Sequence, residues 1–233
     1  MINFNKFFRL FNILSVVLII CSILLLIFKG LNFGIDFKGG TLIELRTNDK
    51  NINVSSLRDT LNSMNLGDIN VKKFGNESDF LIKIENTDKD TIKLFKENLT
   101  ELSGSSFNFR RVENVGPKVS TELLRSGIIA IGLSLAAMLF YIWIRFEWQF
   151  SLGAILALFH DVLVTLGLFS LFSLEINLSI VAAVLTIVGY SMNDTVVIYD
   201  RVRENLKKFS DIKIFELTNI SINETLSRTI ITS

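Results

Sequence analysis

The sequence has 233 residues, of which 49% are hydrophobic, and its mean hydropathy is +0.45. The apolar residues are clustered in long runs, which excludes an ordinary soluble domain and indicates a membrane protein with a soluble insert. The net charge of +1, with no basic patch carrying interleaved aromatic residues, gives no reason to expect nucleic acid as a partner.

Residue counts also exclude several kinds of site. The chain has one cysteine and one histidine, Cys21 and His160, so neither an intrachain disulfide nor a His/Cys zinc site can be assembled. It has no glycine-rich phosphate loop followed by Lys-Ser/Thr, so an ATPase motor within this chain is not expected. We therefore expect no metal and no cofactor, and an energy source outside the chain.

The first apolar run predicts a transmembrane helix. Residues Leu10–Phe28 carry no charge and would span about 28 Å, close to the hydrocarbon thickness of a bilayer. A cleaved signal peptide would have a shorter apolar region and a small-residue cleavage site, and neither is seen. We expect a cytoplasmic N-terminus at 1–9 and an uncleaved transmembrane helix 1 at 10–30.

Residues 31–122 are rich in Asn, Lys, Asp and Ser and predict a folded α+β domain. Apolar residues alternate along Thr41–Arg46 as in a strand, and they repeat at helical spacing after Asn53, a candidate N-cap. The predicted order is β-α-β-β-α-β, the ferredoxin-like arrangement. The other elements expected are strands at 69–74 and 80–85, a second helix whose start Thr87 and Asp90 bracket, with a stripe of Ile92, Phe95, Leu99 and Leu102, and a strand at 105–113.

This domain shows no catalytic constellation. Glu44, Asp68 and Glu85 are interpreted as solvated side chains, and nothing pairs a nucleophile with a base. The sole histidine is predicted in the membrane. We therefore do not expect an enzyme, and interpret the domain as one that binds or spaces something.

Three more apolar runs predict transmembrane helices 2, 3 and 4, at 126–144, 150–172 and 176–199. Small residues punctuate them, which suits close helix packing in lipid, although glycine is common in membrane helices in general. A cytoplasmic segment is expected at 200–219. Residues 220–233 are typical of the start of a fifth helix whose remaining apolar residues are missing, so we expect a truncated chain.

The basic residues predict the orientation of these helices. Lys6 and Arg9, Arg145, and the basic residues between 201 and 208 fall on one side, whereas the loop between helices 3 and 4 carries only Glu175. By the positive-inside rule, the N-terminus and the segment near residue 200 are cytoplasmic. The 31–122 domain then lies on the outer face.

Asp194 lies inside the fourth apolar run, six residues and about 9 Å before Asp200 near the helix end. Because a central Asp costs about 2.5–3.5 kcal/mol in a membrane helix, we interpret Asp194 as a proton-carrying or ion-pairing group that faces other helices. The alternative is an interfacial Asp that reaches headgroup water. Tyr190 and Ser191, one turn earlier, could donate hydrogen bonds to it.

Asp161 lies deeper, roughly 18 Å from Gln149. It is interpreted as functional or paired, since the alternative is an unpaired carboxyl in hydrocarbon. Burial raises the pKa of a carboxyl, so either Asp161 or Asp194 could bind and release protons near physiological pH. The neighbouring His160 is interpreted as a neutral ring that is hydrogen-bonded to another helix.

The start of the fifth helix carries a basic residue at matching depth. If this helix enters the membrane near Ile222, Arg228 lies about 9 Å inside, level with Asp194. An Arg beside a membrane Asp keeps it ionised until the Arg moves or a proton arrives, as a switchable relay requires. A structural salt bridge is the alternative.

Five segments carry a family resemblance. The stretch Phe33–Thr41, with Gly34, Asp36, Gly39 and Gly40, resembles the signature of the SecD/SecF family. The two adjacent glycines alone would indicate only a turn or a bulge. The segments that resemble the SecF members in particular are Arg145–Trp148, Ala154–Val162, Gly189–Thr195 and Leu226–Ser233.

The resemblance implies a multi-pass protein of the bacterial cytoplasmic (inner) membrane, in the resistance-nodulation-division superfamily. Its members have six transmembrane helices and a periplasmic domain between the first two. The implied role is that of a SecDF subunit, which uses the proton motive force to pull or release exported polypeptides. The implied partners are SecD, the SecYEG channel, the unfolded exported polypeptide and protons, with SecA and YajC as indirect partners.

The resemblance also implies site residues. The family's membrane carboxylate falls on Asp194 and its essential arginine on Arg228. Asn193 and Asp161 match motif positions, with a weaker claim to a direct part in the proton relay. The stop at Ser233 departs from the family pattern, because most of helix 5 and all of helix 6 are absent.

Two other functions are alternatives to proton-driven export. A passive scaffold would stabilise SecD and the channel without conducting protons, and would tolerate Asp194→Asn, whereas a relay would not. A small-molecule efflux pump of the same superfamily would need far larger external domains than the insert of about 90 residues.

Overall fold

The computed structural model describes residues 2–47, 52–64, 69–76, 78–85, 93, 95, 97, 99, 107–209 and 211–232. The chain divides into two compact units. The helical unit consists of Met1–Asn32 and Ile129–Ser233. The second unit, Phe33–Ile128, is called the outer unit after the position that the sequence predicts for it.

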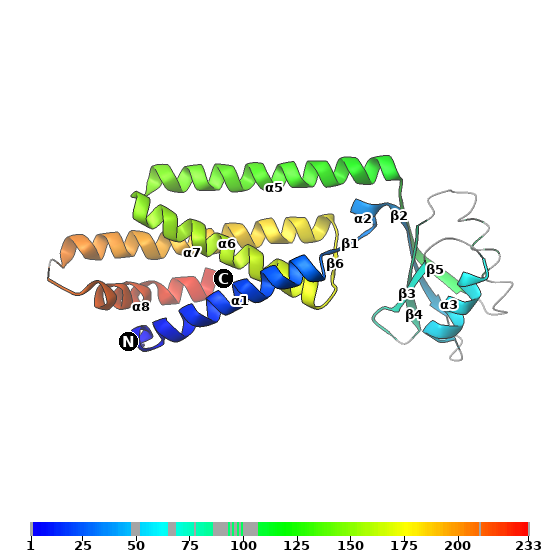
Figure 1. Cartoon of the computed structure of the whole chain (residues 1–233), viewed down its shortest axis with the longest axis horizontal. Helices are drawn as coiled ribbons and strands as arrows, with labels where there is room; N and C mark the ends of the chain where they lie inside the picture. Colours follow the sequence, from blue (N-terminus) through cyan, green and yellow to red (C-terminus); the bar gives the residue numbers. More distant parts are fainter. Residues whose placement is uncertain are drawn as a thin grey trace. The chain divides into compact units, whose positions relative to one another are not determined.

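Within the described residues, four helices are long and apolar enough to cross a membrane (Figure 1). The chain is therefore a multi-pass membrane protein. Two of the helices are longer than their apolar runs. The helix containing 126–144 begins at Pro117, a residue favoured at the first helical position, and the fourth continues past its apolar part to Lys208. The elements of this part of the chain are η1 (Phe4–Phe7), α1 (Phe8–Phe28), β1 (Asn32–Phe33), α5 (Pro117–Arg145), α6 (Trp148–Leu171), β6 (Glu175–Ile176), α7 (Leu178–Lys208) and α8 (Ile214–Thr232).

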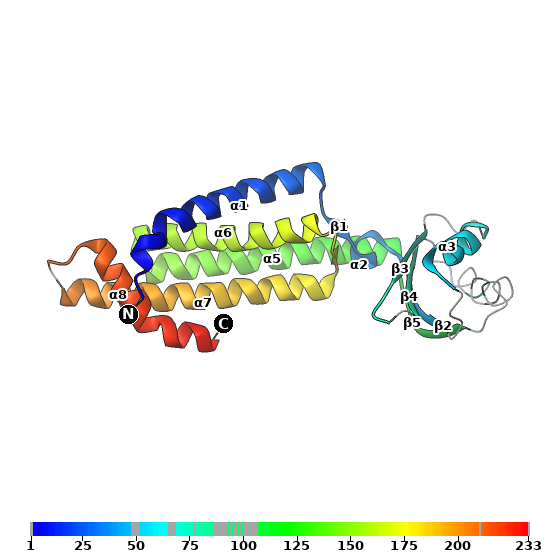
Figure 2. The ribbon, with the colours of Figure 1, turned by 90° about the horizontal axis from the view of Figure 1, so that it is seen from below.

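Helix α6 packs against both α1 and α7, as the two ribbon views show (Figures 1 and 2). The contact with α1 depends on a small residue, because a Cβ atom on Gly167 would lie 2.9 Å from the Cα of Ser22. The Ser170 hydroxyl donates to the Gly30 carbonyl at 2.7 Å across the same contact. The apolar core shared by α5, α6 and α7 consists of Ile142, Phe146, Ala154, Leu158, Val188 and Met192.

The outer unit contains a four-stranded antiparallel sheet in the order β3-β4-β2-β5. Alternate residues of β2 point into its core, and Ile43 opposes Ile82 while Leu45 opposes Phe80. The predicted alternation of Thr41, Ile43 and Leu45 is confirmed, since all three are buried. The elements are α2 (Ile35–Lys38), β2 (Gly40–Thr47), α3 (Val54–Asn62), β3 (Ile69–Lys73), β4 (Asp79–Ile84) and β5 (Phe107–Val115).

The first predicted helix of this unit has the expected cap. The Asn53 side chain accepts a hydrogen bond from the Ser56 amide at 2.8 Å, and the Ser56 hydroxyl accepts one from the Asn53 amide at 3.1 Å. The proposed cap of the second helix, Thr87 and Asp90, lies outside the described residues. Phe95 and Leu99, from its apolar stripe, are helical and buried in the core.

The exposed face of the sheet carries an ionic network. Arg46 donates to both oxygens of Asp79, at 2.5 and 2.7 Å. These hydrogen bonds lower the pKa of the Asp79 carboxyl below its usual value, although burial opposes the shift. Glu44 pairs with Arg110 at 3.4 Å and is 16% exposed in its side chain. The prediction of a solvated side chain is therefore wrong for Glu44. The pairing of β5 with β2 brings Arg110 next to it and covers most of its side chain. Glu85 is exposed, and Asp68 lies outside the described residues.

Of the adjacent glycines of the signature, Gly39 is the C-cap residue of α2, and Gly40 begins β2 between its two neighbouring strands. Gly39 and Gly40 have φ of +80° and +121°, a region that side chains with a Cβ atom rarely adopt. A Cβ atom on Gly40 would lie 2.7 Å from the carbonyl oxygen of Ile84, so only glycine fits without a backbone shift. Gly34 is the N-cap residue of α2, and Asp36 lies in the first turn of that helix.

Candidate functional site

The two carboxylates Asp161 and Asp194 lie at the contacts of α7 with α6 and α8. Asp161 and His160 are on α6, while Ser191, Asn193 and Asp194 are on α7. Both helices are mostly apolar and long enough to cross a membrane. These side chains are therefore polar groups within membrane-spanning elements, where they need partners.

Asp161 joins α6 to α7. Its Oδ2 accepts a hydrogen bond from the Ser191 hydroxyl at 2.5 Å, and its Oδ1 lies 2.9 Å from His160 Nδ1. The ring of His160 thus contacts its own helical neighbour, whereas a partner on another helix was predicted. Its Nε2 is buried and has no hydrogen-bond partner among the described residues. Ser191 was predicted to donate to Asp194, and this is wrong because the α6–α7 contact brings Asp161 to Ser191.

Asp194 joins α7 to α8. The Thr232 hydroxyl donates to Asp194 Oδ1 at 3.1 Å and also contacts the Arg228 carbonyl, one turn earlier on α8, at 3.0 Å. The side chain of Arg228 is exposed and makes no ion pair with a carboxylate in the described part of the chain. Asn193 is exposed on another face of α7. The helix contact therefore brings Thr232 to Asp194, with Arg228 one turn away.

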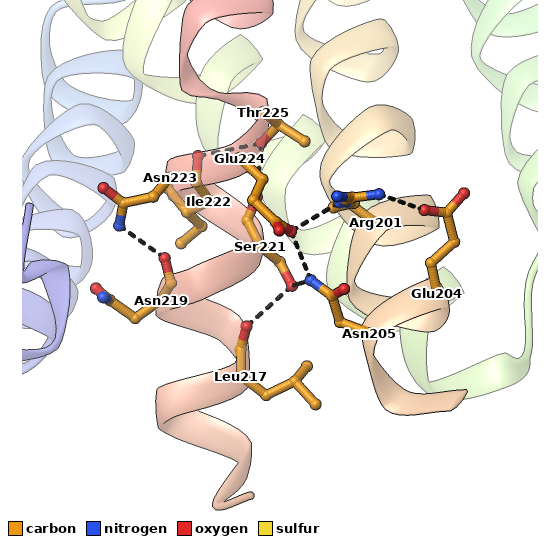
Figure 3. Close-up of polar contacts among 10 residues, drawn as sticks. All are labelled: Arg201, Glu204, Asn205, Leu217, Asn219, Ser221, Ile222, Asn223, Glu224 and Thr225. Atoms are coloured by element: carbon orange, nitrogen blue, oxygen red, sulfur yellow. Dashed lines mark hydrogen bonds and ion pairs between the residues drawn. The ribbon is translucent and has the colours of Figure 1, made fainter. Parts of the chain in front are cut away.

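Two turns further along α7, toward its C-terminal end, a second polar cluster holds α8 (Figure 3). Arg201 Nε donates to Glu224 Oε2 at 2.7 Å, and Arg201 also donates to Glu204 at 2.7 Å. The side chain of Asn205 is buried and donates to Ser221 Oγ at 3.0 Å and to Glu224 Oε2 at 2.8 Å. An ion pair with a buried amide beside it fixes the alignment of the two helices more tightly than a surface ion pair alone.

The sequence reading did not identify this cluster as a site. One signal was available, because Asp194, Arg201 and Asn205 are spaced seven and four residues apart and so share one face of a helix. Their partners on α8 could not be inferred, since the spacing on one helix does not determine the alignment of the next.

Helix α8 also holds the beginning of the chain. The Asn223 side chain accepts from the Ile2 amide at 2.7 Å and donates to the Ile2 carbonyl at 2.9 Å. The Asn219 side chain accepts from the Phe4 amide at 2.8 Å. The first backbone amides of a helix have no partner within it. Asn219 and Asn223, one turn apart on α8, accept hydrogen bonds from these amides at the start of η1. We call this contact the terminal clamp.

At the C-terminal end of α5, Arg145 donates to Asp200 Oδ2 at 2.9 Å. Arg203 lies 3.6 Å from the other oxygen of Asp200, and both arginines lie over the Phe146 ring. The motif Arg145–Trp148 therefore connects α5 to the end of α7. These charges are partly exposed, which suits a position at a membrane surface rather than at its centre.

Known proteins match this chain over nearly its whole length. The sequence model described as protein export membrane protein SecD/SecF, C-terminal, matches residues 95–233, and the SecD/SecF GG motif matches residues 24–50. A protein translocase subunit SecF from Rickettsia bellii is 43% identical over 234 residues, which cover 99% of this chain and 77% of that protein. The corresponding protein of Calditerrivibrio nitroreducens is 45% identical over 232 residues, covering 97% and 76%.

Solved structures agree. The crystal structure of SecDF, a translocon-associated membrane protein from Thermus thermophilus, matches with a TM-score of 0.88 at 34% identity. The match covers 99% of this chain and 32% of that one. A second structure, of SecDF in a super-membrane-facing form, matches with a TM-score of 0.67 at 35% identity. The chain therefore belongs to the SecD/SecF family of protein-export membrane proteins.

Proposed function

We propose that this chain is a SecDF subunit that uses the proton motive force to assist protein translocation across the bacterial cytoplasmic membrane. In this proposal Asp194 takes up and releases the proton. The chain is not itself an enzyme; it pulls or releases the exported polypeptide on the outer face.

The observation that carries the proposal is the position of Asp194. It lies within a membrane-spanning helix, at the contact with α8, and accepts a hydrogen bond from Thr232 at 3.1 Å. A carboxylate at such a depth is costly unless it has a role or a partner. Its surroundings on α8 include the Arg228 side chain, which is exposed and so free to reorient.

Protonation of Asp194 changes the charge at this helix contact. An ionised Asp194 attracts Arg228 and favours α8 close to α7. A protonated Asp194 no longer does so, and α8 can shift while the Thr232 hydroxyl still has its Arg228 carbonyl to bind. Asp161 is a second carboxyl near this contact. It accepts a hydrogen bond from Ser191, one turn from Asp194 on α7, so a shift of α7 also affects α6. Asn193, next to Asp194 in sequence but exposed on another face of α7, has a weaker claim to a part in this relay.

The outer unit fits a domain that contacts exported chains. We infer a periplasmic position for it, from the basic residues at the C-terminal end of α7 and at the start of the chain around the beginning of α1. Its strand order, with α3 between β2 and β3, is the order of a ferredoxin-like domain. The partners proposed are SecD, the SecYEG channel and the unfolded polypeptide, with SecA and YajC acting indirectly. SecD has the strongest support, because the matching SecDF chain is about three times as long as this one.

Release of a pulse-labelled secreted protein tests the proposal. The only SecF in the cell carries Asp194→Asn, with expression level and membrane potential matched to the wild type. The matched control is Asp200→Asn, the same change six residues later on α7, at a partly exposed carboxylate. A relay predicts release near the level without SecF for Asp194→Asn, and near wild type for Asp200→Asn. Unchanged release in both variants would make the protein a passive scaffold.

A further inference from the structure

Charged side chains of both signs line the contact between α7 and α8. They are Glu204, Arg201 and Asp194 on α7, and Glu224 and Arg228 on α8. Two ion pairs are made in the structure, Glu204 with Arg201 and Arg201 with Glu224, both at 2.7 Å. Arg228 and Asp194 lie further toward the membrane.

The hydrogen bonds across this contact show an antiparallel alignment of the two helices. Asn205 contacts Ser221, Arg201 contacts Glu224, and Asp194 contacts Thr232, so the residue numbers of facing pairs add to nearly the same value. By this alignment Arg228 faces the turn of α7 between Arg201 and Asp194. Figure 3 shows the first part of the contact, with the Glu224 carboxylate between Arg201 and Asn205.

Arg228 lies between two carboxylates on this face. Glu224 and Thr232 are four residues before and after it, about 6 Å each way along the helix axis. Residues four apart on a helix are neighbours, and a Glu preceding a basic residue by four is the favourable orientation. Arg228 therefore has Glu224 one turn toward the loop and Asp194, at the level of Thr232, one turn toward the membrane.

We propose that Glu224 is a second ion-pair partner for Arg228, occupied when Asp194 is protonated. This rests on the proposed relay at Asp194 and adds a positioning residue to it. When Asp194 is ionised, Arg228 turns toward it and Glu224 stays with Arg201. When a proton binds Asp194, Arg228 turns to Glu224 and competes with Arg201 for its oxygens. Protonation of Asp194 thereby changes the ion pairs of Glu224, which lies closer to the loop that connects α7 to α8.

Other charged groups near Asp194 already have partners in the structure. On α6, Asp161 binds Ser191 and contacts His160; on α5, Arg145 pairs with Asp200. On α8, Arg228 makes no ion pair within the described residues, and Glu224, one turn from it, pairs with Arg201. The hydrogen bond from Asn205 holds Glu224 in place through the exchange.

The test is the pH dependence of proton-driven release, measured with the full-length protein in place of the native one. Glu224→Gln keeps the shape and the hydrogen-bond acceptor but removes the charge, so Arg228 stays with Asp194 and keeps it ionised. We expect the midpoint of release against external pH to move down by about one unit. Glu224→Asp restores the charge and should return the midpoint toward wild type. Asp211→Asn, an exposed loop carboxylate, is the charge-matched control.

Arg201→Gln gives the opposite expectation. With Arg201 neutral, Glu224 holds Arg228 more firmly, Asp194 is protonated more readily, and the midpoint should rise. A purely structural role predicts slower release at every pH in both variants with no change of midpoint, and that result would overturn the proposal. Asp194→Asn distinguishes failure of the relay from failure of the role of Glu224. If Asp194→Asn has no effect on release, the relay proposal is wrong. If it abolishes release while Glu224→Gln leaves the midpoint unchanged, only the proposed role of Glu224 is wrong.

Discussion

The two units place polar and apolar groups in opposite ways. In the outer unit the core is apolar, and the exposed face of the sheet carries Glu44, Arg46 and Arg110. In the helical unit large apolar side chains such as Leu133 and Trp143 point outward, while Asn205 and Ser221 are buried between helices. One chain thus contains a soluble arrangement and a membrane arrangement, in which apolar side chains also face outward and polar ones are buried between helices.

The difference shows which force holds each unit together. Burial of apolar surface stabilises the outer unit, because its surroundings are water. A membrane offers the helices no such gain, so close approach at small residues and hydrogen bonds between helices must provide the association. The Gly167–Ser22 contact and the Asn205 hydrogen bonds are examples of these two means. Substitutions of the same kind should therefore have different effects in the two units.

The largest expected effect is that of Phe80→Ala in the outer unit. Phe80 is 0% exposed, and removing a buried Phe costs about 3–5 kcal/mol. Hydrogen exchange of the β2 and β4 amides in the purified chain would measure the loss. The control is Phe74→Ala, where the side chain lies in the same unit and is 52% exposed. We expect that change to stay within about 0.5 kcal/mol; equal costs at both positions would contradict the comparison.

A smaller effect is expected for Asn205→Ala in the helical unit. The Asn205 side chain is 1% exposed, and its loss removes two hydrogen bonds, which should cost about 1–3 kcal/mol. Both tryptophans, Trp143 and Trp148, lie in this unit, so fluorescence during detergent-induced unfolding reports on it alone. Asn12→Ala, at an exposed position on α1, is the matched control. A cost at Asn205 no greater than at Asn12 would show that polar contacts do not hold these helices.

The smallest effect concerns pH. The pKa of Asp79 is lowered in the folded state, so its contribution to stability is complete above the unfolded value and is lost as the pH falls through the folded one. The outer unit should therefore lose stability below about pH 4, by a modest amount because Arg46 is partly exposed and solvent screens the pair. Circular dichroism of wild type and Asp79→Asn between pH 7 and pH 3 would show a shallower dependence in the variant. Identical slopes would assign the acid sensitivity to other groups.

The fold was predictable wherever one element's own pattern decides its structure. Alternation along Thr41–Arg46 predicted a strand with one buried face, and the position of Asn53 predicted a helix cap. Length and hydropathy predicted the four long helices. The network of Glu44 with Arg110 was missed, because the two residues meet through strand pairing across more than 60 positions of sequence.

The candidate site was predictable in its residues but not in its pairs. Burial cost alone identified Asp161 and Asp194 as groups that need a partner. The donor to Asp161 comes from α7 and the donor to Asp194 comes from α8, so each depends on how two helices align. Ser191 was assigned to the wrong carboxyl for this reason. Glu224 and Asn205 were overlooked, since each is ordinary in its own segment and acquires meaning only from the partner helix.

The terminal clamp has a consequence for the order of biosynthesis. The Ile2 and Phe4 amides leave the ribosome 221 and 215 residues before Asn223 and Asn219, the side chains that bind them. At typical rates of translation this interval is roughly 10–45 s. Throughout it α1 can already be in the bilayer, while its leading segment waits for these partners. The helical unit can therefore bind its own first residues only after Asn219 and Asn223 of α8 have been made.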